Sequence, residues 1–338
     1  MSKTFGKTFG AAIFGTVPAR SVVHQVQLAE ELCFDSAWVV DSQLLCREAY
    51  VTLAACAVQT SRIKLATGVT NPLTRHPSVV ASAAITLDEL SNGRMMVGIS
   101  TGNSAVRPVG LKPATVAEVE QYVSVLTHLL RNQPAQFTAG VQGKINWLEK
   151  PTAIPVYVAA TNPKLTHAAG RFADGAVLFQ GISPELVLRG VQHVTAGAAE
   201  ALRQPNAVDV ALWVPLSVSS DGRRARDNIR GRVAAVLKYS RLDSFAGPDR
   251  EVVQRLKQEY DYFEHTSAKA RHAELVSDEM IDRYALAGTP QEVREKLEQL
   301  MRLPGFGKII VQPEVSDGEL SPETVFRTFV DDVLSHIV

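Results

Sequence analysis

The sequence predicts an α/β fold with parallel strands, and two patterns support this prediction. Strand-like and helix-like segments alternate along nearly the whole chain, as they do in folds built from βα units. Several strand-like segments end in Gly, Thr, Asn or Ser, which suits the sheet edge where such folds bind ligands. A length of 338 residues fits either two average domains or one α/β barrel with insertions.

In the first half of the chain, apolar and β-branched runs alternate with segments of helical spacing. The runs predict strands at 11–15, 36–40, 63–67 and 94–99. Apolar residues at helical spacing predict helices at 21–33, 49–60, 77–90 and 115–130. Pro77 suits the first turn of the third helix, and Asn92-Gly93 ends that helix, because Pro fixes φ and Gly permits a left-handed turn.

The second half continues the alternation. Further strands are predicted at 154–160, 175–179, 208–217 and 308–312. Helix-start signals lie at Asn162-Pro163, Ser183-Pro184, Asp221 and Thr289-Pro290, and a terminal helix follows the last strand. Residues 134–150 lack periodicity, which predicts a loop or a hairpin lying over the barrel.

A helical insertion is expected at about 238–286, within a chain that we treat as a single domain of residues 1–338. Placed before the last strand, it could cover the mouth as a lid or form an oligomer contact. Its aromatic and imidazole side chains are Tyr262, Phe263, His265 and His272. The helix before it carries a basic run that fits either an anionic cofactor tail or a solvated face. That run comprises Arg223, Arg224, Arg226, Arg230 and Arg232.

Composition and charge exclude several functional classes. Acidic and basic residues number 35 each without a long charged block, so a nucleic acid is not an expected partner. Cys33, Cys46 and Cys56 lack the spacing of a zinc site or of a disulfide framework, so we expect a cytoplasmic protein without a metal. Because the chain starts with polar residues and the apolar run at 11–17 is short, neither a signal peptide nor a membrane span is expected.

Two polar loops, 68–72 and 100–104, follow neighbouring predicted strands. Both loops lie beyond the carboxyl ends of parallel strands, the edge where α/β folds bind ligands. Their small polar residues, with Arg75 and Arg107 nearby, suit a planar, anionic or carbonyl-rich ligand. The alternative is that Gly, Asn and Pro only shape the turns.

Two motifs in this region give the chain a resemblance to a known family. They read GVTNPLTRHP at 68–77 and TLDELSNGR at 86–94. They resemble the bacterial-luciferase-like superfamily of flavin and deazaflavin oxidoreductases, and within it the branch of methylenetetrahydromethanopterin reductases. The resemblance implies a TIM-type (β/α)8 barrel with insertions near its carboxyl-terminal end. It also implies a flavin-like cofactor at the carboxyl-terminal mouth and a non-prolyl cis peptide at Gly68-Val69.

The resemblance further implies where that cofactor binds. Gly68 and Val69 would support the back face of its ring, and Thr70 or Asn71 would hydrogen-bond its carbonyl edge. The neighbouring wall would consist of Thr101, Gly102, Asn103 and Ser104. Its phosphate would lie at the start of the helix that follows Ala160 and Thr161, where backbone N–H groups and the helix dipole favour an anion. Lys164 beside this site either binds the phosphate or is a solvated side chain after a turn. The last residues implied for cofactor binding are Gln180 and Gly181.

Three side chains are candidates for a direct part in the reaction: Asp41, Asn71 and His76. Asp41 could be a polar contact or a general base, or it could cap the next helix. His76 has no triad partner that the sequence reveals. Because no nucleophile elbow, Walker loop or cluster of metal ligands is present, the chemistry is expected to belong to the cofactor.

Two enzymatic reactions and one non-catalytic role fit these features. The preferred one is a monooxygenase reaction on a small organic substrate, using reduced FMN, oxygen and a separate NAD(P)H:flavin reductase as partner. The alternative is hydride transfer with the deazaflavin coenzyme F420, and the non-catalytic role is flavin binding. The loop at 103–108 lacks the acidic Gly-Asp type of sequence found in the reductases, which argues against a pterin substrate. A homo-oligomer is also expected.

Overall fold

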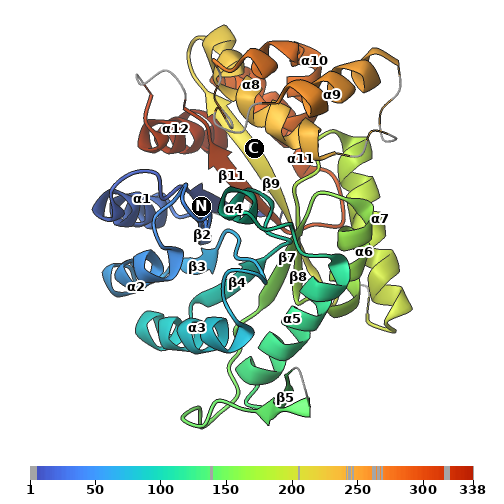
Figure 1. Cartoon of the computed structure of the whole chain (residues 1–338). Coiled ribbons are helices and arrows are strands. Elements are labelled where there is room, and N and C mark those ends of the chain that lie inside the picture. Colours follow the sequence, from blue (N-terminus) through green and yellow to red (C-terminus); the bar gives the residue numbers. More distant parts are fainter. Residues whose placement is uncertain are drawn as a thin grey trace.

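Eight parallel strands of the described chain close into a barrel with helices around it, which confirms the predicted TIM-type fold (Figure 1). The strand order is β1-β2-β3-β4-β7-β8-β9-β11, and β11 pairs with β1 to close the barrel. The computed structural model describes residues 6–137, 140–204, 206–240, 242, 245, 247–260, 264, 267, 269–315 and 320–337. Tyr262, Phe263 and His265, which the sequence singled out, lie outside these described residues.

The amino-terminal half follows the predicted alternation. Its strands are β1 (Thr8–Ile13), β2 (Ser36–Val39), β3 (Lys64–Thr67) and β4 (Met95–Ile99). Its helices are α1 (Ala19–Glu31), α2 (Ala49–Gln59), α3 (Pro77–Ser91), α4 (Asn103–Val106) and α5 (Val116–Leu130). Only α4 does not show in the sequence, because four residues are too few for a helical period to appear.

The carboxyl-terminal half adds one strand that the sequence does not predict. Its barrel strands are β7 (Val156–Ala160), β8 (Gly175–Leu178), β9 (Asp209–Val218) and β11 (Lys308–Pro313). Its main helices are α6 (Pro163–Phe172), α7 (Pro184–Glu200), α8 (Gly222–Tyr239), α11 (Pro290–Met301) and α12 (Pro322–Thr328). The extra strand, β10 (Leu286–Gly288), pairs with β9 outside the barrel. Three residues are too few to show a strand pattern, so the sequence shows only the start of α11 there.

Two segments extend beyond the barrel. The insertion expected at 238–286 contains α9 (Gly247–Glu259) and α10 (Asp278–Tyr284), which pack with α8 at the top of Figure 1 and bury their own apolar cluster. The hairpin consists of β5 (Ala135–Gln136) and β6 (Gln142–Gly143), and it packs beside α5 instead of over the barrel (Figure 1). No described helix has both the length and the apolar character needed to cross a membrane.

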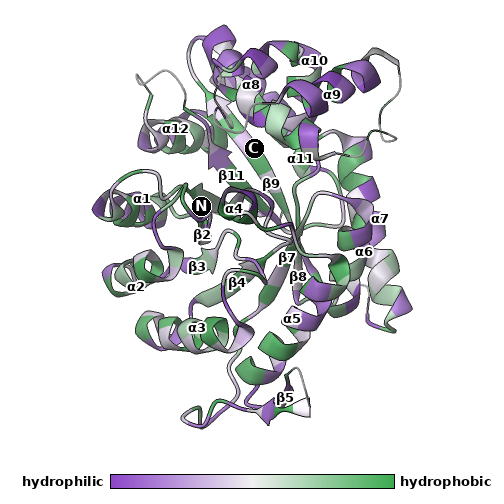
Figure 2. Cartoon of the chain, viewed as in Figure 1, coloured by the Kyte–Doolittle hydropathy of each residue, from purple (hydrophilic) through white to green (hydrophobic). Residues whose placement is uncertain are grey.

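The apolar core has two layers, one between the strands and the helices and one inside the barrel. In Figure 2, hydrophobic residues lie along the strands and on the inward faces of the helices, whereas polar residues cover much of α9 and α10. Inside the barrel, the Trp38 indole is fully buried, donates to Ser36 Oγ at 3.0 Å and lies edge-on to the Tyr157 ring. These side chains fill the barrel below its mouth, so space for a ligand remains only above them.

The segment after β3 is held closely against β4. The Gly68-Val69 peptide bond is cis, as the resemblance implies. The Thr70 backbone N–H donates to the Gly98 carbonyl at 2.8 Å, and the Ser100 N–H donates to the Thr70 carbonyl at 3.0 Å. A Cβ atom at Gly98 would overlap the Thr67 carbonyl oxygen, so only glycine allows β3 and β4 to approach this closely.

Candidate functional site

A cavity of about 520 Å³ opens at the carboxyl-terminal mouth of the barrel. The segments at or just after the ends of the barrel strands form most of its walls, together with residues of α8, α1 and α12. This volume lies within the range of roughly 300–1,000 Å³ that is typical of small-molecule sites. The larger apolar side chains that line it are Phe14, Val17, Val40, Leu45, Val69, Val177, Phe179, Trp213, Val236 and Val315.

The two polar loops predicted from the sequence meet in one wall of this cavity. Gly68 and Val69 line it from the first loop, and residues 101–104 line it from the second. Gly102 has a φ of +82°, and a Cβ atom there would lie 2.6 Å from Asn71 Cβ. Glycine therefore lets the two loops touch, and the wall that they form lies where a cofactor ring was expected.

Thr70 and Asn71 lie behind this wall. Both are fully buried, and neither lines the cavity. Asn71 Oδ1 accepts hydrogen bonds from the backbone N–H groups of Leu73 at 3.0 Å and Thr74 at 3.1 Å. Asn71 thus shapes the loop, in agreement with the alternative that residues of this kind only form the turns. Its position gives no support to a direct part in the reaction.

Asp41 lines the cavity, but its charge is already compensated. Arg75 donates to both carboxylate oxygens of Asp41, at 2.6 and 3.3 Å, and Gln43 Nε2 donates to Oδ1 at 2.9 Å. Burial alone would lower the pKa of Arg75, but the carboxylates of Asp41 and Glu48 raise that pKa on balance. These hydrogen bonds hold the carboxylate in one orientation, so its surroundings favour a polar contact and give no support to the role of general base. Glu48, and not Asp41, caps α2.

Three other predicted side chains lie outside the cavity. His76 caps α3, where its Nδ1 accepts from the Ser78 backbone N–H at 3.3 Å. Lys164 is exposed on the first turn of α6. Arg107 is also exposed and donates from Nε to Asn103 Oδ1 at 2.7 Å. The catalytic role predicted for His76 and the anion-binding roles predicted for Lys164 and Arg107 therefore gain no support from these positions.

The remaining predicted residues divide between two cavities. Ala160 and Thr161, at the end of β7, line the main cavity. Thr161 and Gln180 line a second cavity of about 100 Å³ beside it. Gly181 lines neither cavity, and a Cβ atom there would lie 2.8 Å from the Arg283 carbonyl oxygen. Gly181 is thus explained by a close approach of backbone segments.

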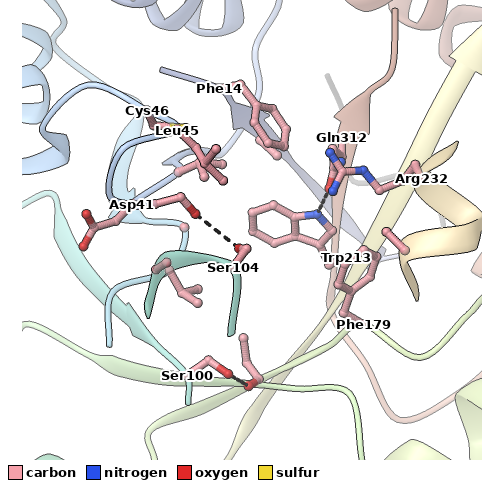
Figure 3. A pocket seen from close by; sticks show the side chains of 18 of the residues that line it. Phe14, Asp41, Leu45, Cys46, Ser100, Ser104, Phe179, Trp213, Arg232 and Gln312 are labelled. Carbon is pink, nitrogen blue, oxygen red and sulfur yellow. Dashed lines mark hydrogen bonds between the residues drawn. The ribbon is translucent and has the colours of Figure 1, made fainter. Parts of the chain in front are cut away.

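Another wall of the cavity is formed by β9, β11 and α8, and hydrogen bonds link four of its side chains into a network. Trp213 Nε1 on β9 donates to Gln312 Oε1 on β11 at 2.5 Å (Figure 3). Gln312 Nε2 in turn donates to Glu314 Oε1. Arg232 Nε on α8 donates to the same Glu314 oxygen at 2.6 Å. All four residues line the cavity. Only partial signals for these residues are present in the sequence: the carboxyl end of the last strand, and a basic run in which Arg232 does not stand out.

Four titratable side chains line the cavity within the described part of the chain: Asp41, Cys46, Arg232 and Glu314. Burial raises the pKa of the Cys46 thiol, and the nearby Asp41 carboxylate adds to this rise. The thiol is therefore protonated at neutral pH. The Asp41 carboxylate is paired with Arg75, and the Glu314 carboxylate is paired with Arg232. Among the described residues, the cavity thus presents no uncompensated charge.

The lining of the cavity fits the fused ring of a flavin or a deazaflavin. Such a ring needs apolar contact on its faces and hydrogen-bond donors at its carbonyl edge. Val69, Phe179 and Trp213 provide apolar surfaces, and Thr101 and Ser104 provide hydroxyl donors. In the parts of the chain that the structure describes, no group of three or more His, Cys, Asp or Glu residues is arranged to hold a metal ion.

Comparison with known proteins places the chain among oxidoreductases. A family model described as luciferase-like monooxygenase matches residues 5–306. The chain is 28% identical over 311 residues to 5,10-methylenetetrahydromethanopterin reductase of Methanolobus tindarius, covering 87% of this chain and 90% of that protein. It is 28% identical over 294 residues to F420-dependent glucose-6-phosphate dehydrogenase of Amycolatopsis mediterranei, covering 81% and 82%. The structure of coenzyme F420 dependent tetrahydromethanopterin reductase from Methanopyrus kandleri superposes with a TM-score of 0.81 at 23% identity, covering 98% and 99%.

Proposed function

The chain belongs to the luciferase-like monooxygenase family, and from this premise we propose that it transfers hydride between coenzyme F420 and a small organic substrate. The observation that carries the proposal is the cavity at the barrel mouth, with Gly68 and Val69 in one wall. The names of the relatives support the choice of cofactor, since one is an F420-dependent dehydrogenase and the structural relative is an F420 dependent reductase.

In this proposal, the residues of the chain bind the cofactor and shape the reaction space. Val69 supports one face of the ring, and the hydroxyl groups of Thr101 and Ser104 hold its carbonyl edge. Phe14, Phe179 and Trp213 exclude water from the space that remains for the substrate (Figure 3). A bound deazaflavin supplies the chemistry of a hydride carrier that does not need oxygen.

A second candidate is the reaction preferred from the sequence, a monooxygenase reaction with reduced FMN and oxygen. The description of the matching family favours it, and the cavity fits a flavin ring as well as a deazaflavin ring. In that case a separate NAD(P)H:flavin reductase would be the partner. We place this candidate second because two of the three relatives described above are named for F420 and none of the three is named for FMN.

Titration of the purified protein separates the two cofactors. Oxidised F420 and oxidised FMN are added in separate experiments, and binding is followed by the change in cofactor fluorescence. We expect F420 to bind with a Kd at least about tenfold lower than that of FMN, a difference of about 1.4 kcal/mol. Tighter binding of FMN would overturn the choice of cofactor, and no binding of either would overturn the proposal as a whole.

A matched pair of variants tests the location of the site. Ser104→Trp places an indole in the cavity wall and should raise the Kd for F420 more than about tenfold, because the ring loses its space. Ser124→Trp adds the same side chain to the exposed face of α5, away from the cavity, and should leave the Kd unchanged. Equal effects of the two variants would show that the cofactor binds elsewhere.

A further inference from the structure

The hydrogen-bond directions in the wall formed by β9, β11 and α8 are fixed by chemistry. An indole N–H can only donate, so the contact with Trp213 Nε1 assigns the oxygen of the Gln312 amide to that side. The Gln312 amino group must then face Glu314 Oε1 and donate to it. Glu314 Oε1 consequently receives two donors, because Arg232 Nε also donates to it at 2.6 Å.

The pair formed by Arg232 and Glu314 retains unused hydrogen-bonding groups. Among the described residues, the two terminal amino groups of Arg232 have no acceptor, and Glu314 Oε2 has no donor. The two side chains are only 12% and 10% exposed, and both residues line the cavity. The Arg232 guanidinium also lies over the Phe14 ring, 5.3 Å from its centroid, which limits the orientations that it can adopt. Donors and an acceptor are therefore held side by side in a largely buried wall.

The charge of this pair selects the kind of group that can bind to it. The positive charge of Arg232 is compensated by Glu314 at 2.6 Å, so an added anion would be attracted by the guanidinium but repelled by the carboxylate. An added cation would likewise be repelled by Arg232. A hydroxyl group can accept from the guanidinium and donate to Glu314 Oε2 at once, and a carbonyl group can accept from the guanidinium. The surrounding surface is apolar, with Phe14, Phe179 and Val236 in the lining.

We propose that Arg232 and Glu314 form the substrate-binding pair of the cavity and hold the hydroxyl or carbonyl oxygen of a small, uncharged, otherwise apolar substrate. This inference rests on the proposed function for its assumption that the wall at Gly68, Val69 and residues 101–104 takes the cofactor. It names the substrate class for that function: an alcohol and the corresponding ketone or aldehyde, and not a carboxylate or a phosphate ester.

A set of probes with one carbon skeleton tests the proposal. Cyclohexanol, cyclohexanone, cyclohexanecarboxylate and cyclohexylamine are titrated into the full-length protein saturated with F420, and binding is measured by saturation-transfer NMR. We expect the alcohol and the ketone to bind about tenfold more tightly than the two charged probes. This readout does not depend on turnover. The same titrations without F420 show whether the pair binds the probes independently of the cofactor.

Variants of the pair should change the preference, which loss of structure alone would not do. Glu314→Gln removes the negative charge and leaves Arg232 uncompensated, so binding of cyclohexanecarboxylate should strengthen about tenfold while binding of cyclohexanol weakens. Arg232→Gln should weaken binding of the alcohol and the ketone. Arg226→Gln is the matched control, because Arg226 lies on the same helix but pairs with Asp282 outside the cavity, and it should change nothing.

Three results would overturn the proposal. The first is wild-type protein that binds the carboxylate as tightly as the alcohol. The second is a Glu314→Gln variant that keeps the wild-type preference. The third is weaker binding of F420, with unchanged binding of the probes, in both variants of the pair, which would assign the pair to the cofactor. Failure of F420 to bind wild-type protein that still prefers the alcohol would instead contradict the proposed function and leave the binding pair supported.

Discussion

At the residue scale, one buried ion pair joins the segment after β2 to the segment after β3. Asp41 is 3% exposed and receives two hydrogen bonds from Arg75. The Arg75 guanidinium lies 4.8 Å from the centroid of the Tyr50 ring. The backbone carbonyl of Arg75 accepts a hydrogen bond from the Tyr122 hydroxyl at 2.9 Å. Arg75 therefore connects four parts of the chain around one wall of the cavity.

Removing the cation from this pair should destabilise the protein strongly. In Arg75→Met, the Asp41 carboxylate stays buried without its partner, which typically costs about 3–5 kcal/mol in the free energy of unfolding. Urea unfolding followed by circular dichroism measures the loss. The double variant Arg75→Met with Asp41→Asn should regain part of the lost free energy of unfolding, because the amide of Asn carries no charge. Arg107→Met, at an exposed position, is the control, and a loss below about 1 kcal/mol in Arg75→Met would contradict the argument.

The three cysteines should react with iodoacetamide at very different rates. Cys33 is exposed and should react first, whereas burial raises the pKa of Cys56 to about 12 and should prevent its reaction in the folded protein. Cys46 lines the cavity, and its raised pKa leaves less thiolate at a given pH, so its reaction should be slow at pH 7 and accelerate as the pH rises. Mass spectrometry of digested protein measures each rate, with urea-unfolded protein as the control. Equal rates for Cys46 and Cys33 at pH 7 would contradict the expected protonation.

The sequence identified residues near the site better than it identified their roles. The GVTNPLTRHP motif located one wall of the cavity, because Gly, Asn and Pro mark a shaped loop whatever they contact. It could not separate Val69, which lines the cavity, from Asn71, which holds the loop from behind. That difference depends on the direction in which each side chain points in the loop after β3, and a single sequence does not reveal this direction.

At the element scale, the second motif serves to join secondary structures. Arg94, at the start of β4, donates to the backbone carbonyls of Ala57, Thr60, Ile63 and Ser91 at 2.6–2.9 Å. These carbonyls belong to the carboxyl-terminal ends of α2 and α3 and to the segment before β3. The TLDELSNGR string thus supports the fold behind the cavity, and its strength as a family signature does not make its residues part of the reaction.

The helices α6 and α7 pack so closely that two glycines are required between them. A Cβ atom at Gly197 would overlap the His167 carbonyl oxygen, and one at Gly170 would overlap the Val194 carbonyl oxygen. Gly197→Ala should therefore force α7 away from α6 and lower the free energy of unfolding by about 1–3 kcal/mol. Thermal unfolding checks this, with Ala196→Ser on the exposed side of α7 as the control. An unchanged Tm in Gly197→Ala would mean that the two helices can separate without loss.

At the scale of the whole molecule, closure of the barrel creates the wall that the sequence did not predict. Trp213, Arg232 and Glu314 are far apart along the chain and lie on β9, α8 and the end of β11. Their contacts exist because β11 pairs with both β9 and β1. Alternation of strands and helices predicts such a barrel, but it does not give the register between strands. The fold class was therefore predictable, whereas this network was not.

The outer surface of the barrel carries exposed apolar side chains through which we predict that the chain forms a homo-oligomer. The helices α2 and α3 lie side by side and expose Val51 at 72%, Val58 at 59% and Val79 at 54%. Exposed apolar side chains on two neighbouring helices can be buried by the same helices of a second copy, because each copy contributes the same surface to a two-fold symmetric interface. We therefore predict a dimer through α2 and α3, which size-exclusion chromatography with light scattering would detect as twice the mass of the chain.

Charged substitutions test which surface forms this dimer. Val58→Glu combined with Val79→Glu places like charges on both copies of the face and should shift the protein to the mass of one chain at micromolar concentration. Leu202→Glu changes a residue that is 94% exposed just beyond the end of α7 and should leave the mass unchanged. A dimer that persists in the double variant would contradict the assignment to α2 and α3. Because none of the three substituted residues lines the cavity, binding of F420 by a monomeric variant would also show that each chain contains a complete cofactor site.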